Sequence, residues 1–417
     1  MKPQQYGYWI GFRRPSPDDV PYGWKLKRLQ EIATFSSGGK LQLTMSDYVD
    51  SGFDAYTAEG LNGKVNVAQF DGPAVIVSSI GARCGKCFYA RGKFTALANV
   101  QVIFPDPKEL NPYFVWNLVN DERFWPRYAT AQPFIRPSDI RESWIPVPPR
   151  QEQDIIADVL ETADATITRT HEALVNARKL RKALIDELLR RGVRTEKSKK
   201  SVAGFVPASW NCEPLGLHIQ DGPTNGVYRP ESDYGSRGIP IVRIDSFADG
   251  RIHNIGKLRR VNVESVIEGR YALSKDDVLI NRVNSLSHIG KAAIVPGLDE
   301  PTIFESNMMR LRTGPRLLPE FLIIILCSDI ARKHWLARAK PAVNQASINQ
   351  RDVRELQLPI PEIDEQREIV RISSASTAHI DRLEAIATAQ QLLKKSLMHD
   401  LLTGRVRVKN PKAILQS

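Results

Sequence analysis

The sequence predicts an α+β protein with two mixed α/β domains separated by a pair of long antiparallel helices, a coiled-coil spacer in a pseudo-two-fold internal repeat. Three observations lead to this prediction: two helical segments that align with each other, a short motif upstream of each, and strand-rich blocks between motif and helix. The length of 417 residues allows two or three domains of about 150 residues each. An internal repeat of this kind determines the architecture of a chain.

The helical segments are residues 145–194 and 358–407, which align without a gap at an offset of 213 residues. Of the 50 aligned positions, 15 are identical. Both segments open with the pattern Pro-x-Pro-x-x-x-Glu-Gln, at residues 146–153 and 359–366. Two unrelated helices would share leucines by chance, but they would rarely share this opening as well. The match therefore indicates a true repeat.

A second motif, Val-Pro-x-x-Trp, stands upstream of each helical segment, at residues 20–24 and 206–210. The blocks that follow the two motifs differ in length and share little sequence apart from their final stretch. The chain is therefore expected to divide into an N-terminal tail (1–19), a first domain (20–144), a first connector helix (145–195), a linker (196–205), a second domain (206–357), a second connector helix (358–404) and a C-terminal tail (405–417).

The connectors are predicted to be helices because neither Pro nor Gly occurs from Gln151 to Arg191 and apolar residues recur every three or four positions. Gly192 and Gly404 stand where such helices would end. A narrow apolar stripe needs a partner helix, and the chain connectivity makes the pair antiparallel. An alternative is two surface helices, each packed on its own domain. The seam expected between the helices consists of Ile156, Ile167, Leu180, Leu184, Leu188, Ile369, Ile380, Leu393, Leu397 and Leu401.

The blocks between motif and helix contain short β-branched runs, such as residues 75–80, 100–104, 239–244 and 278–280, joined by glycine-rich and polar loops. With 58 Lys and Arg against 47 Asp and Glu, the net charge of +11 favours an anionic partner, nucleic acid before membrane. Cationic and amide side chains on such loops can reach phosphates and base edges, although each loop alone is also typical of a solvated turn. The candidate DNA-binding residues are Ser37, Lys40, Arg83, Lys86, Asn225, Arg243, Arg282, Asn284 and Lys291.

Catalytic and cofactor motifs were sought with little result. Gly38-Gly-Lys40 lacks the remaining elements of a phosphate-binding loop, and no G-x-G-x-x-G pattern follows a strand. Asn111-Pro-Tyr-Phe114 is similar to a motif of amino-methylating enzymes but lacks its second proline, so Asn111 is expected to cap a helix. Cys84 and Cys87 have no second ligand pair at zinc spacing, and local packing explains them better than metal or redox chemistry. No catalytic residue and no metal site are predicted.

The chain carries no apolar run of the roughly 20 residues that a membrane span needs. Its first 14 residues lack the pattern of a secretory signal, and four cysteines make no disulfide framework. A cytoplasmic protein without a membrane partner is therefore expected.

Taken together, the two motifs and two helices resemble the specificity subunit of type I restriction-modification enzymes. The resemblance covers residues 20 to 407, and its most specific marks are the two Pro-x-Pro-x-x-x-Glu-Gln openings and the closing Leu401-Leu-Thr-Gly-Arg405. The first copy departs from that ending, with Leu188-Leu-Arg-Arg-Gly192. Residues 1–19 lie outside the pattern.

The resemblance implies a non-catalytic subunit whose two target-recognition domains each read one half of a split, asymmetric site in double-stranded DNA. It implies that the helices dock two methyltransferase subunits, which methylate adenine N6, and that restriction subunits join them. S-adenosylmethionine, ATP and Mg would be used by those partners, with no cofactor bound by this chain. The alternative from another class is a coiled-coil adaptor that links two protein-binding heads and never touches DNA. The steep salt dependence of DNA binding would separate the two.

Overall fold

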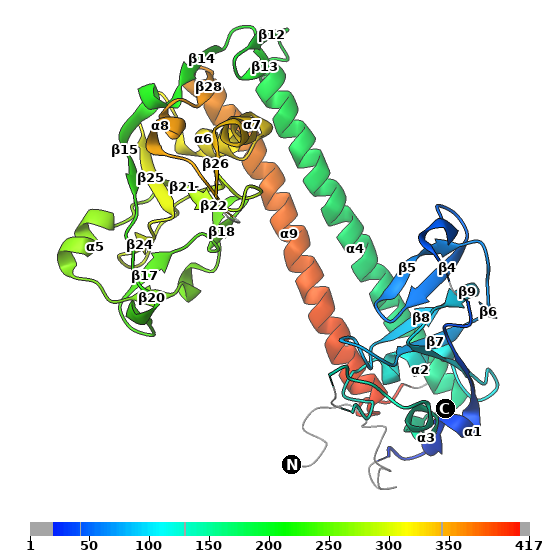
Figure 1. Ribbon diagram of the computed structural model, residues 1–417. Helices are drawn as coiled ribbons and strands as arrows, with labels where there is room; N and C mark the ends of the chain where they lie inside the picture. Colours follow the sequence, from blue (N-terminus) through cyan, green and yellow to red (C-terminus); the bar gives the residue numbers. More distant parts are fainter. Residues whose placement is uncertain (1–19, 42, 129–130, 343–344, 409–417) are drawn as a thin grey trace, which may run out of the picture. The chain divides into compact units, whose positions relative to one another are not determined.

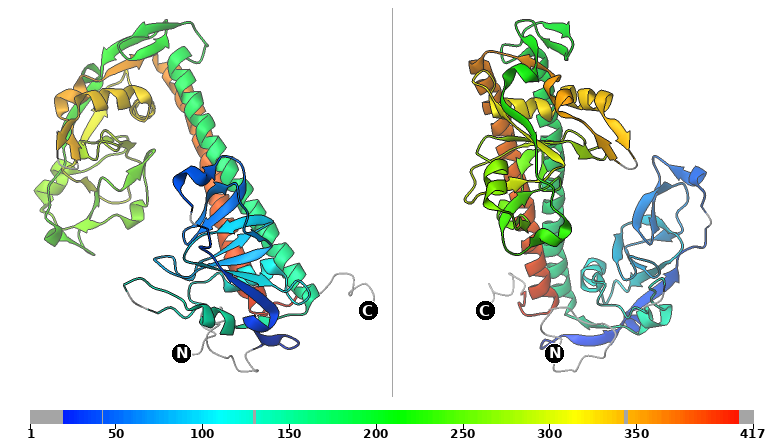
Figure 2. Two further views of the ribbon diagram at one scale, coloured as in Figure 1. Left: turned by 45° about the vertical axis from the view of Figure 1, so that its right-hand side comes forward. Right: turned by 60° about the vertical axis from the view of Figure 1, so that its left-hand side comes forward.

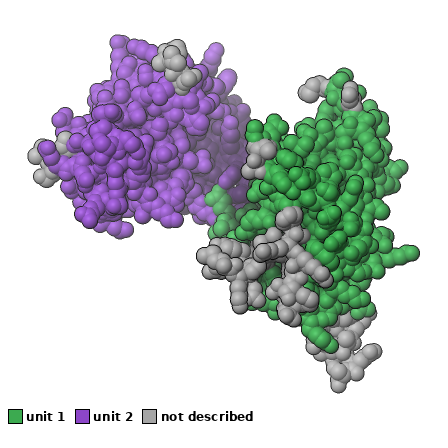
Figure 3. Space-filling model, turned by 60° about the horizontal axis from the view of Figure 1, so that its bottom comes forward, with its two compact units in different colours: residues 1–172, 384–417 green, residues 173–383 purple. Residues whose placement is uncertain are grey.

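The structure is a computed structural model that describes residues 20–41, 43–128, 131–342 and 345–408 (Figure 1). It divides into two compact units (Figure 3). Unit 1 comprises residues 1–172 and 384–417, and unit 2 comprises residues 173–383. Each unit contains one of the predicted strand-rich blocks, which we call arm 1 and arm 2, and one half of each connector helix.

Both connector helices form, but they are shorter than the expected ranges 145–195 and 358–404, because each range begins with a strand, β11 (Trp144–Val147) or β28 (Gln357–Ile360). Helix α4 (Arg150–Arg191) leads from unit 1 into unit 2, and helix α9 (Ile363–Leu402) leads back into unit 1. Figure 2 shows each of them as one unbroken helix. Each ends at a glycine in the left-handed region, Gly192 with φ +66° and Gly404 with φ +67°, where a side chain would be strained.

Helices α4 and α9 contact each other inside each unit. Residues that come later in α4 contact residues that come earlier in α9. In unit 2, Arg181 Nε donates to Thr377 Oγ1 at 3.0 Å. In unit 1, Lys394 Nζ donates to Asp164 Oδ1. At the offset of 213 residues, Arg181 corresponds to Lys394 and Asp164 to Thr377, so the two contacts are copies of one contact. Where they touch, the helices are antiparallel.

The prediction that Leu180 and Leu393 belong to the buried seam is wrong. Leu180 is 70% exposed and Leu393 is 59% exposed, because the contacting stripe passes through their neighbours Arg181 and Lys394 instead. A period of 3.6 residues allows steps of three or four, and the sequence alone did not fix which step is taken at each turn. Five predicted seam residues are buried, namely Ile156, Leu188, Ile369, Ile380 and Leu401. Three are half-buried, namely Ile167, Leu184 and Leu397.

Arm 1 contains a four-stranded sheet, a five-stranded sheet and the two-stranded sheet β1-β11, with short helices beside them. The four-stranded sheet has the order β2-β10-β7-β8 and the five-stranded sheet the order β3-β5-β4-β9-β6. Helix α2 packs against β7, β8 and β10. The elements are β1 (Lys25–Arg28), α1 (Leu29–Ile32), β2 (Ala33–Ser37), β3 (Tyr48–Val49), β4 (Phe53–Thr57), β5 (Gly60–Val65), β6 (Phe70–Asp71), β7 (Ala74–Ser78), β8 (Cys87–Ala90), β9 (Lys93–Ala96), β10 (Val100–Pro105), α2 (Pro112–Val119), α3 (Pro137–Glu142) and β11 (Trp144–Val147).

Arm 2 has a six-stranded sheet of order β15-β25-β21-β23-β19-β18, a four-stranded sheet of order β16-β20-β17-β24 and a three-stranded sheet of order β22-β27-β26. Helix α6 lies against β19 and β23. The elements, with the hairpin that precedes them, are β12 (Ser198–Ser201), β13 (Gly204–Pro207), β14 (Asn211–Pro214), β15 (Ile219–Asn225), β16 (Tyr234–Gly235), β17 (Ile239–Val242), β18 (Phe247–Ala248), β19 (Gly250–Ile252), β20 (Arg260–Val261), α5 (Ser265–Tyr271), β21 (Val278–Asn281), β22 (Val283–Asn284), β23 (Ala292–Ile294), β24 (Ile303–Phe304), β25 (Met308–Thr313), α6 (Pro319–Leu326), α7 (Asp329–Arg338), β26 (Lys340–Ala342), β27 (Gln345–Ser347), α8 (Gln350–Arg354) and β28 (Gln357–Ile360).

Each arm shares its hydrophobic core with the helix ends of its own unit. In unit 1, Phe114 and Trp125 of arm 1 belong to one buried cluster with Ile156 and Leu160 of α4 and Leu401 of α9. In unit 2, the corresponding cluster joins residues of α6 and β25 to both helices through Ile185, Leu188 and Ile369. Burial of such side chains stabilises each by about 1.5–3 kcal/mol, so arm and helices hold together as one body within a unit.

Two local predictions concern residues of arm 1. Asn111 caps α2, since its side-chain oxygen accepts hydrogen bonds from the backbone N–H groups of Tyr113 (2.9 Å) and Phe114 (3.1 Å). Cys84 and Cys87 are free, buried thiols within the core of unit 1. Burial raises the pKa of both thiols, that of Cys87 beyond the range in which a thiolate forms. Local packing is therefore their role in this fold.

Candidate nucleic-acid interface

The two sequence motifs of each repeat meet in space, which explains their residue types. In unit 1, Trp24 Nε1 of the Val-Pro-x-x-Trp motif donates to Glu152 Oε2 of the Glu-Gln pair at 3.1 Å. In unit 2, Trp210 Nε1 donates to Glu365 Oε2, also at 3.1 Å. Both indoles are buried, and a buried indole N–H needs an acceptor. The glutamate supplies it in each copy.

The same glutamates also fasten the end of the other helix. In unit 2, the second oxygen of Glu365 accepts from the backbone N–H of Val193, directly after α4, at 3.0 Å. In unit 1, Arg407, shortly after α9, donates to Glu152 through Nε and Nη2, both at 2.7 Å. Each junction therefore joins the motif tryptophan, the start of one helix and the end of the other.

The glutamines beside them tie each helix start to the arm. Gln153 accepts from the Asn111 backbone N–H at 2.8 Å and donates to the carbonyls of Glu109 (3.0 Å) and Pro148 (2.9 Å). Both this glutamine and its counterpart in unit 2 are fully buried.

Gln366 makes the equivalent three bonds in unit 2, accepting from the Leu318 N–H (2.9 Å) and donating to the carbonyls of Arg316 (2.9 Å) and Pro361 (3.0 Å). An amide is the one side chain that can satisfy a donor and two acceptors in this way.

The arms share a backbone framework although their sequences do not align. Strands β2 and β15 are each followed by a glycine whose N–H bonds to the neighbouring strand, a feature we call the glycine bracket. Gly38 N donates to Val100 O at 3.0 Å, and Gly226 N donates to Met308 O at 3.1 Å. A Cβ on Gly38 would lie 2.0 Å from the Leu97 carbonyl oxygen, and a Cβ on Gly226 would lie 2.3 Å from that of Glu305. Both positions therefore require glycine for close approach to backbone.

A loop follows β7 in arm 1 and β21 in arm 2, and it is closed by the same hydrogen bonds in both. In arm 1, Ser78 N donates to Lys86 O at 2.9 Å and Gly85 N to Ser78 O at 2.8 Å. We call residues 79–86 reading loop 1, because they contain two of the candidate DNA-binding residues.

In arm 2 the corresponding bonds are Asn281 N to Lys291 O (2.8 Å) and Gly290 N to Asn281 O (3.0 Å). Residues 282–291 are accordingly reading loop 2. Each loop also contacts the residue just before the neighbouring strand of the sheet, β10 or β25, with Ser79 N donating to Asn99 O at 2.9 Å and Arg282 N to Asn307 O at 2.8 Å. In each arm, the bracket glycine and the first residue of the loop therefore bond to two consecutive residues of one segment, Asn99 and Val100 in arm 1 and Asn307 and Met308 in arm 2.

This framework pairs four of the candidate DNA-binding residues. Ser37 lies opposite Gln101 on β10, and Asn225 lies opposite Met309 on β25, one residue before the bracket glycine in each arm. Lys86 and Lys291 close the two reading loops at equivalent positions. The side chains of Ser37 and Asn225 are exposed, and those of the two lysines are half-buried.

The remaining candidates in reading loop 2 and near it have protein partners. Arg282 donates from Nη1 to Ser306 O at 3.3 Å, and the Asn284 side-chain oxygen accepts from Ser285 N at 2.8 Å. The guanidinium of Arg243 lies 3.5 Å from the Glu305 carboxylate. Burial raises the pKa of Glu305, while its bonds to the Ile244 N–H and Arg243 act in the opposite direction. The side chain of Arg243 is 27% exposed, so it lies beside this acid while part of it still faces solvent.

In arm 1, Arg83 donates from Nη1 to Glu59 O at 2.9 Å, and Lys40 Nζ donates to Ser36 Oγ at 3.4 Å. Both lysine and arginine side chains remain accessible on the surface of unit 1. Such contacts hold a cation in place without removing it from solvent, so it can still approach a phosphate.

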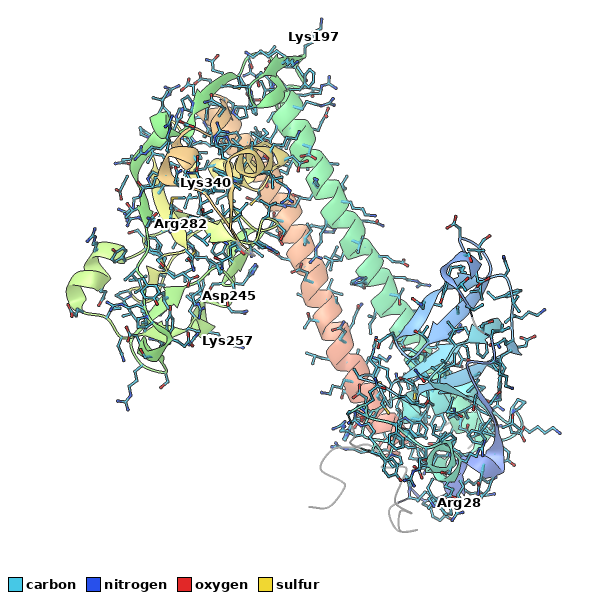
Figure 4. All side chains as sticks on the ribbon, in the orientation of Figure 1. Arg28, Lys197, Asp245, Lys257, Arg282 and Lys340 are labelled. Carbon is cyan, nitrogen blue, oxygen red and sulfur yellow. The ribbon has the colours of Figure 1, made fainter. Side chains whose placement is uncertain are left out.

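Sequence reasoning missed one element that belongs to this surface. In arm 2, β22 pairs with β27 and β27 with β26, so Val283 of reading loop 2 lies opposite Ser347, and Lys340 opposite Ser347 on its other side. Figure 4 labels Arg282 and Lys340, the basic residues of this group. In arm 1, isolated bridges join Ile80 to Phe134 and Phe134 to Tyr128 in the same arrangement. The only sequence signal was the weak match of residues 135–140 with 348–353.

Within the described parts of the chain, no group of three or more His, Cys, Asp or Glu side chains could hold a metal ion. The same residues contain no helix long and apolar enough to cross a membrane.

Comparison with known proteins identifies the framework. The family model described as type I restriction modification DNA specificity domain matches residues 21–177 and 228–394, one copy for each repeat. The chain belongs to this family. The first matched copy contains Trp24, Glu152 and Gln153, and the second contains Glu365 and Gln366 but begins after Trp210.

Relatives and solved structures of the specificity family cover most or part of the chain. The MjaVIII type I restriction enzyme specificity subunit of Methanocaldococcus jannaschii is 24% identical over 417 residues, covering 94% of this chain and 95% of that protein. A protein of the same organism named as the MjaX specificity subunit is 29% identical over 214 residues, which are 51% of this chain and 49% of that relative. The crystal structure of the type I restriction-modification S subunit from M. genitalium has a TM-score of 0.60 at 15% identity, covering 94% of this chain and 98% of that one. The last comparison concerns the fold alone.

Proposed function

We propose that this chain is the DNA specificity subunit of a type I restriction-modification system and that each arm reads one half of a bipartite, asymmetric site. The observation that carries the proposal is the shared framework: the same glycine bracket and the same loop closure present different side chains in the two arms. A reader of two different half-sites needs this combination. The family membership supports it, because the names of the relatives specify the same role.

The chain itself is proposed to be non-catalytic. Adenine methylation requires the base to be flipped into an enzyme pocket, and we assign that step, with its S-adenosylmethionine, to two methyltransferase subunits that dock on the helices. ATP and Mg are assigned to restriction subunits that join the same complex. The role of this chain is to hold those partners over the right sequence.

The recognition domains are proposed to be residues 20–144 and 206–357, with 145–195 and 358–404 as a coiled-coil spacer. Support for the spacer comes from the duplicated polar contacts between α4 and α9, and from the junctions that join the helix ends to each motif tryptophan.

The test exchanges residues 20–144 for the equivalent block of a related subunit, with the methyltransferase partners present. Methylation sequencing should show that one half of the methylated motif changes and the other persists. A change in both halves together would contradict separate reading by the two arms. A matched exchange of residues 206–357 should alter only the other half.

A salt titration provides the independent check of DNA binding. Affinity of the complex for its duplex should fall steeply with salt, because each neutralised phosphate releases counterions. Binding that ignores salt, or a complex that binds no duplex, would favour the adaptor role instead.

A further inference from the structure

We propose that reading loop 2 contacts the bases of its half-site and that Leu286 recognises the 5-methyl group of a thymine there. This inference rests on the proposed function and adds to it a named loop and a chemical determinant. It concerns unit 2 alone.

The loop is held firmly at its base, which a base-reading element requires. Beyond the closing bonds of Asn281, Ile348 N donates to Arg282 O at 2.9 Å, so a neighbouring strand fixes the first residue of the loop. At the other end Ile289 is only 6% exposed, and Gly290 lies against the buried indole of Trp335. A Cβ on Gly290 would lie 2.1 Å from Trp335 Cδ1, so the contact admits no side chain there.

Between these anchors the loop turns tightly and presents its side chains outward. The backbone N–H groups of His288 and Ile289 both donate to Ser285 O at 2.9 Å, which closes the turn. Leu286 at its tip is 53% exposed, and Ser287 and His288 beside it are also exposed. The tip therefore has a defined position without being buried.

The chemistry of the tip matches a base edge. The hydroxyls of Ser285 and Ser287 lie 3.0 Å apart, and each lies 2.9 Å from His288 Nδ1, so three hydrogen-bonding groups flank Leu286 in the sequence of the turn. In the major groove a thymine shows an apolar methyl beside the O4 acceptor, and serine hydroxyls bond to base edges. A single exposed leucine is ordinary on a protein surface. Leu286 differs because it stands at the tip of an anchored turn with hydroxyl groups on the neighbouring residues, so an apolar contact to a thymine methyl and hydrogen bonds to the base edge can be made together.

Cations around the loop supply the phosphate contacts. Arg332 donates from Nη1 to the carbonyl of Ser287 at 3.3 Å, and Arg282 and Lys291 stand at the two ends of the loop. Reading loop 1 occupies the same framework with Ile80, Ala82 and Arg83 at its surface. Its different side chains are expected to read a different base step.

The experiment first determines the methylated motif of the complex with its methyltransferase partners, then measures binding to duplexes that contain it. Each thymine of the half-site read by arm 2 is replaced singly by deoxyuridine, which removes only the methyl group. The intact complex should lose affinity about fourfold at one such position, the factor that corresponds to transfer of one methyl group from water.

Leu286→Ala should lose a similar factor on the natural duplex and should no longer respond to deoxyuridine at that position. The matched control is Leu217→Ala, a leucine of the same arm that is 72% exposed and lies outside the loop. It should bind and respond to deoxyuridine as the unaltered chain does. Circular dichroism of both variants checks that the arm is folded.

The outcomes separate the two levels of proposal. A complex without any bipartite motif would contradict the proposed function itself. A normal motif with Leu286→Ala equal to the unaltered chain at every thymine would leave the function intact and overturn the role of the loop.

Discussion

Replacing Gln153 by alanine should destabilise unit 1 by about 3 kcal/mol. The side chain is fully buried and makes three hydrogen bonds to backbone groups of the arm and the helix start, at 2.8, 2.9 and 3.0 Å. Each such bond contributes about 1 kcal/mol net, so the loss of three gives about 3 kcal/mol. Gln366→Ala should have the same effect in unit 2, because its three bonds are equivalent.

Hydrogen exchange read by mass spectrometry can assign the loss to one unit, which a single unfolding curve of a multidomain chain cannot. A loss of about 3 kcal/mol corresponds to roughly a hundredfold faster exchange, expected around Asn111 for Gln153→Ala and around Leu318 for Gln366→Ala. The control is Gln151→Ala, an exposed glutamine two residues away, which should change stability by less than about 0.5 kcal/mol. A Gln153→Ala protein that exchanges like this control would refute the account of the Glu-Gln motif.

Three further perturbations test other parts of the structure. Gly226→Ala should destabilise unit 2 by about 1–3 kcal/mol in thermal unfolding, since its Cβ would meet two backbone carbonyls, whereas Gly235→Ala, with no atom within 4 Å, should be neutral. Burial lowers the pKa of His334 in the folded state below its ordinary value of 6.5. The unfolded chain therefore takes up this proton first, so stability is full above pH 6.5 and decreases as the pH falls from 6.5 through the folded-state pKa. Denaturant unfolding near pH 5 and pH 7.5 should show this loss, and His334→Gln should reduce it. A double-mutant cycle with Lys394→Met and Asp164→Asn should give a coupling of about 1 kcal/mol that falls with salt, and zero coupling would remove this contact from the helix pairing.

Helices and strands could be predicted from the sequence where periodicity and stop residues agree. The first connector helix, expected over 145–195, occupies Arg150–Arg191, which matches the stretch without Pro or Gly to within one residue, and the predicted strand 278–280 is β21, one residue longer. The phase of the helix contact could not be predicted, because Arg181 and Lys394 carry long apolar stems that pack as leucines do while their charged ends reach a polar partner. Hydrophobicity alone therefore selected the neighbouring leucines.

The shared backbone framework of the two arms also could not be predicted from the sequence. Alignment found the connectors but not the arms, since the bonds that close both reading loops and both glycine brackets join backbone atoms. Every residue can accept a backbone hydrogen bond, and every residue except proline can also donate one. Such bonds therefore place almost no restriction on the residue type. Only the bracket glycines restrict the residue type, because a Cβ there would meet backbone carbonyl oxygens of another segment. The sequence does not show which carbonyls lie opposite them.

The same distinction explains why one part of each repeat is uniform and the other varied. The junctions depend on particular side chains: an indole N–H needs a carboxylate, and one amide must satisfy a donor and two acceptors. The two copies therefore keep Trp, Glu and Gln. The reading loops depend on backbone bonds and a glycine, so the exposed residues between the anchors are free to differ without cost to the fold. A reader built in this way can change its half-site by exchanging loop residues such as Leu286, while the helices and junctions that hold its partners stay unaltered.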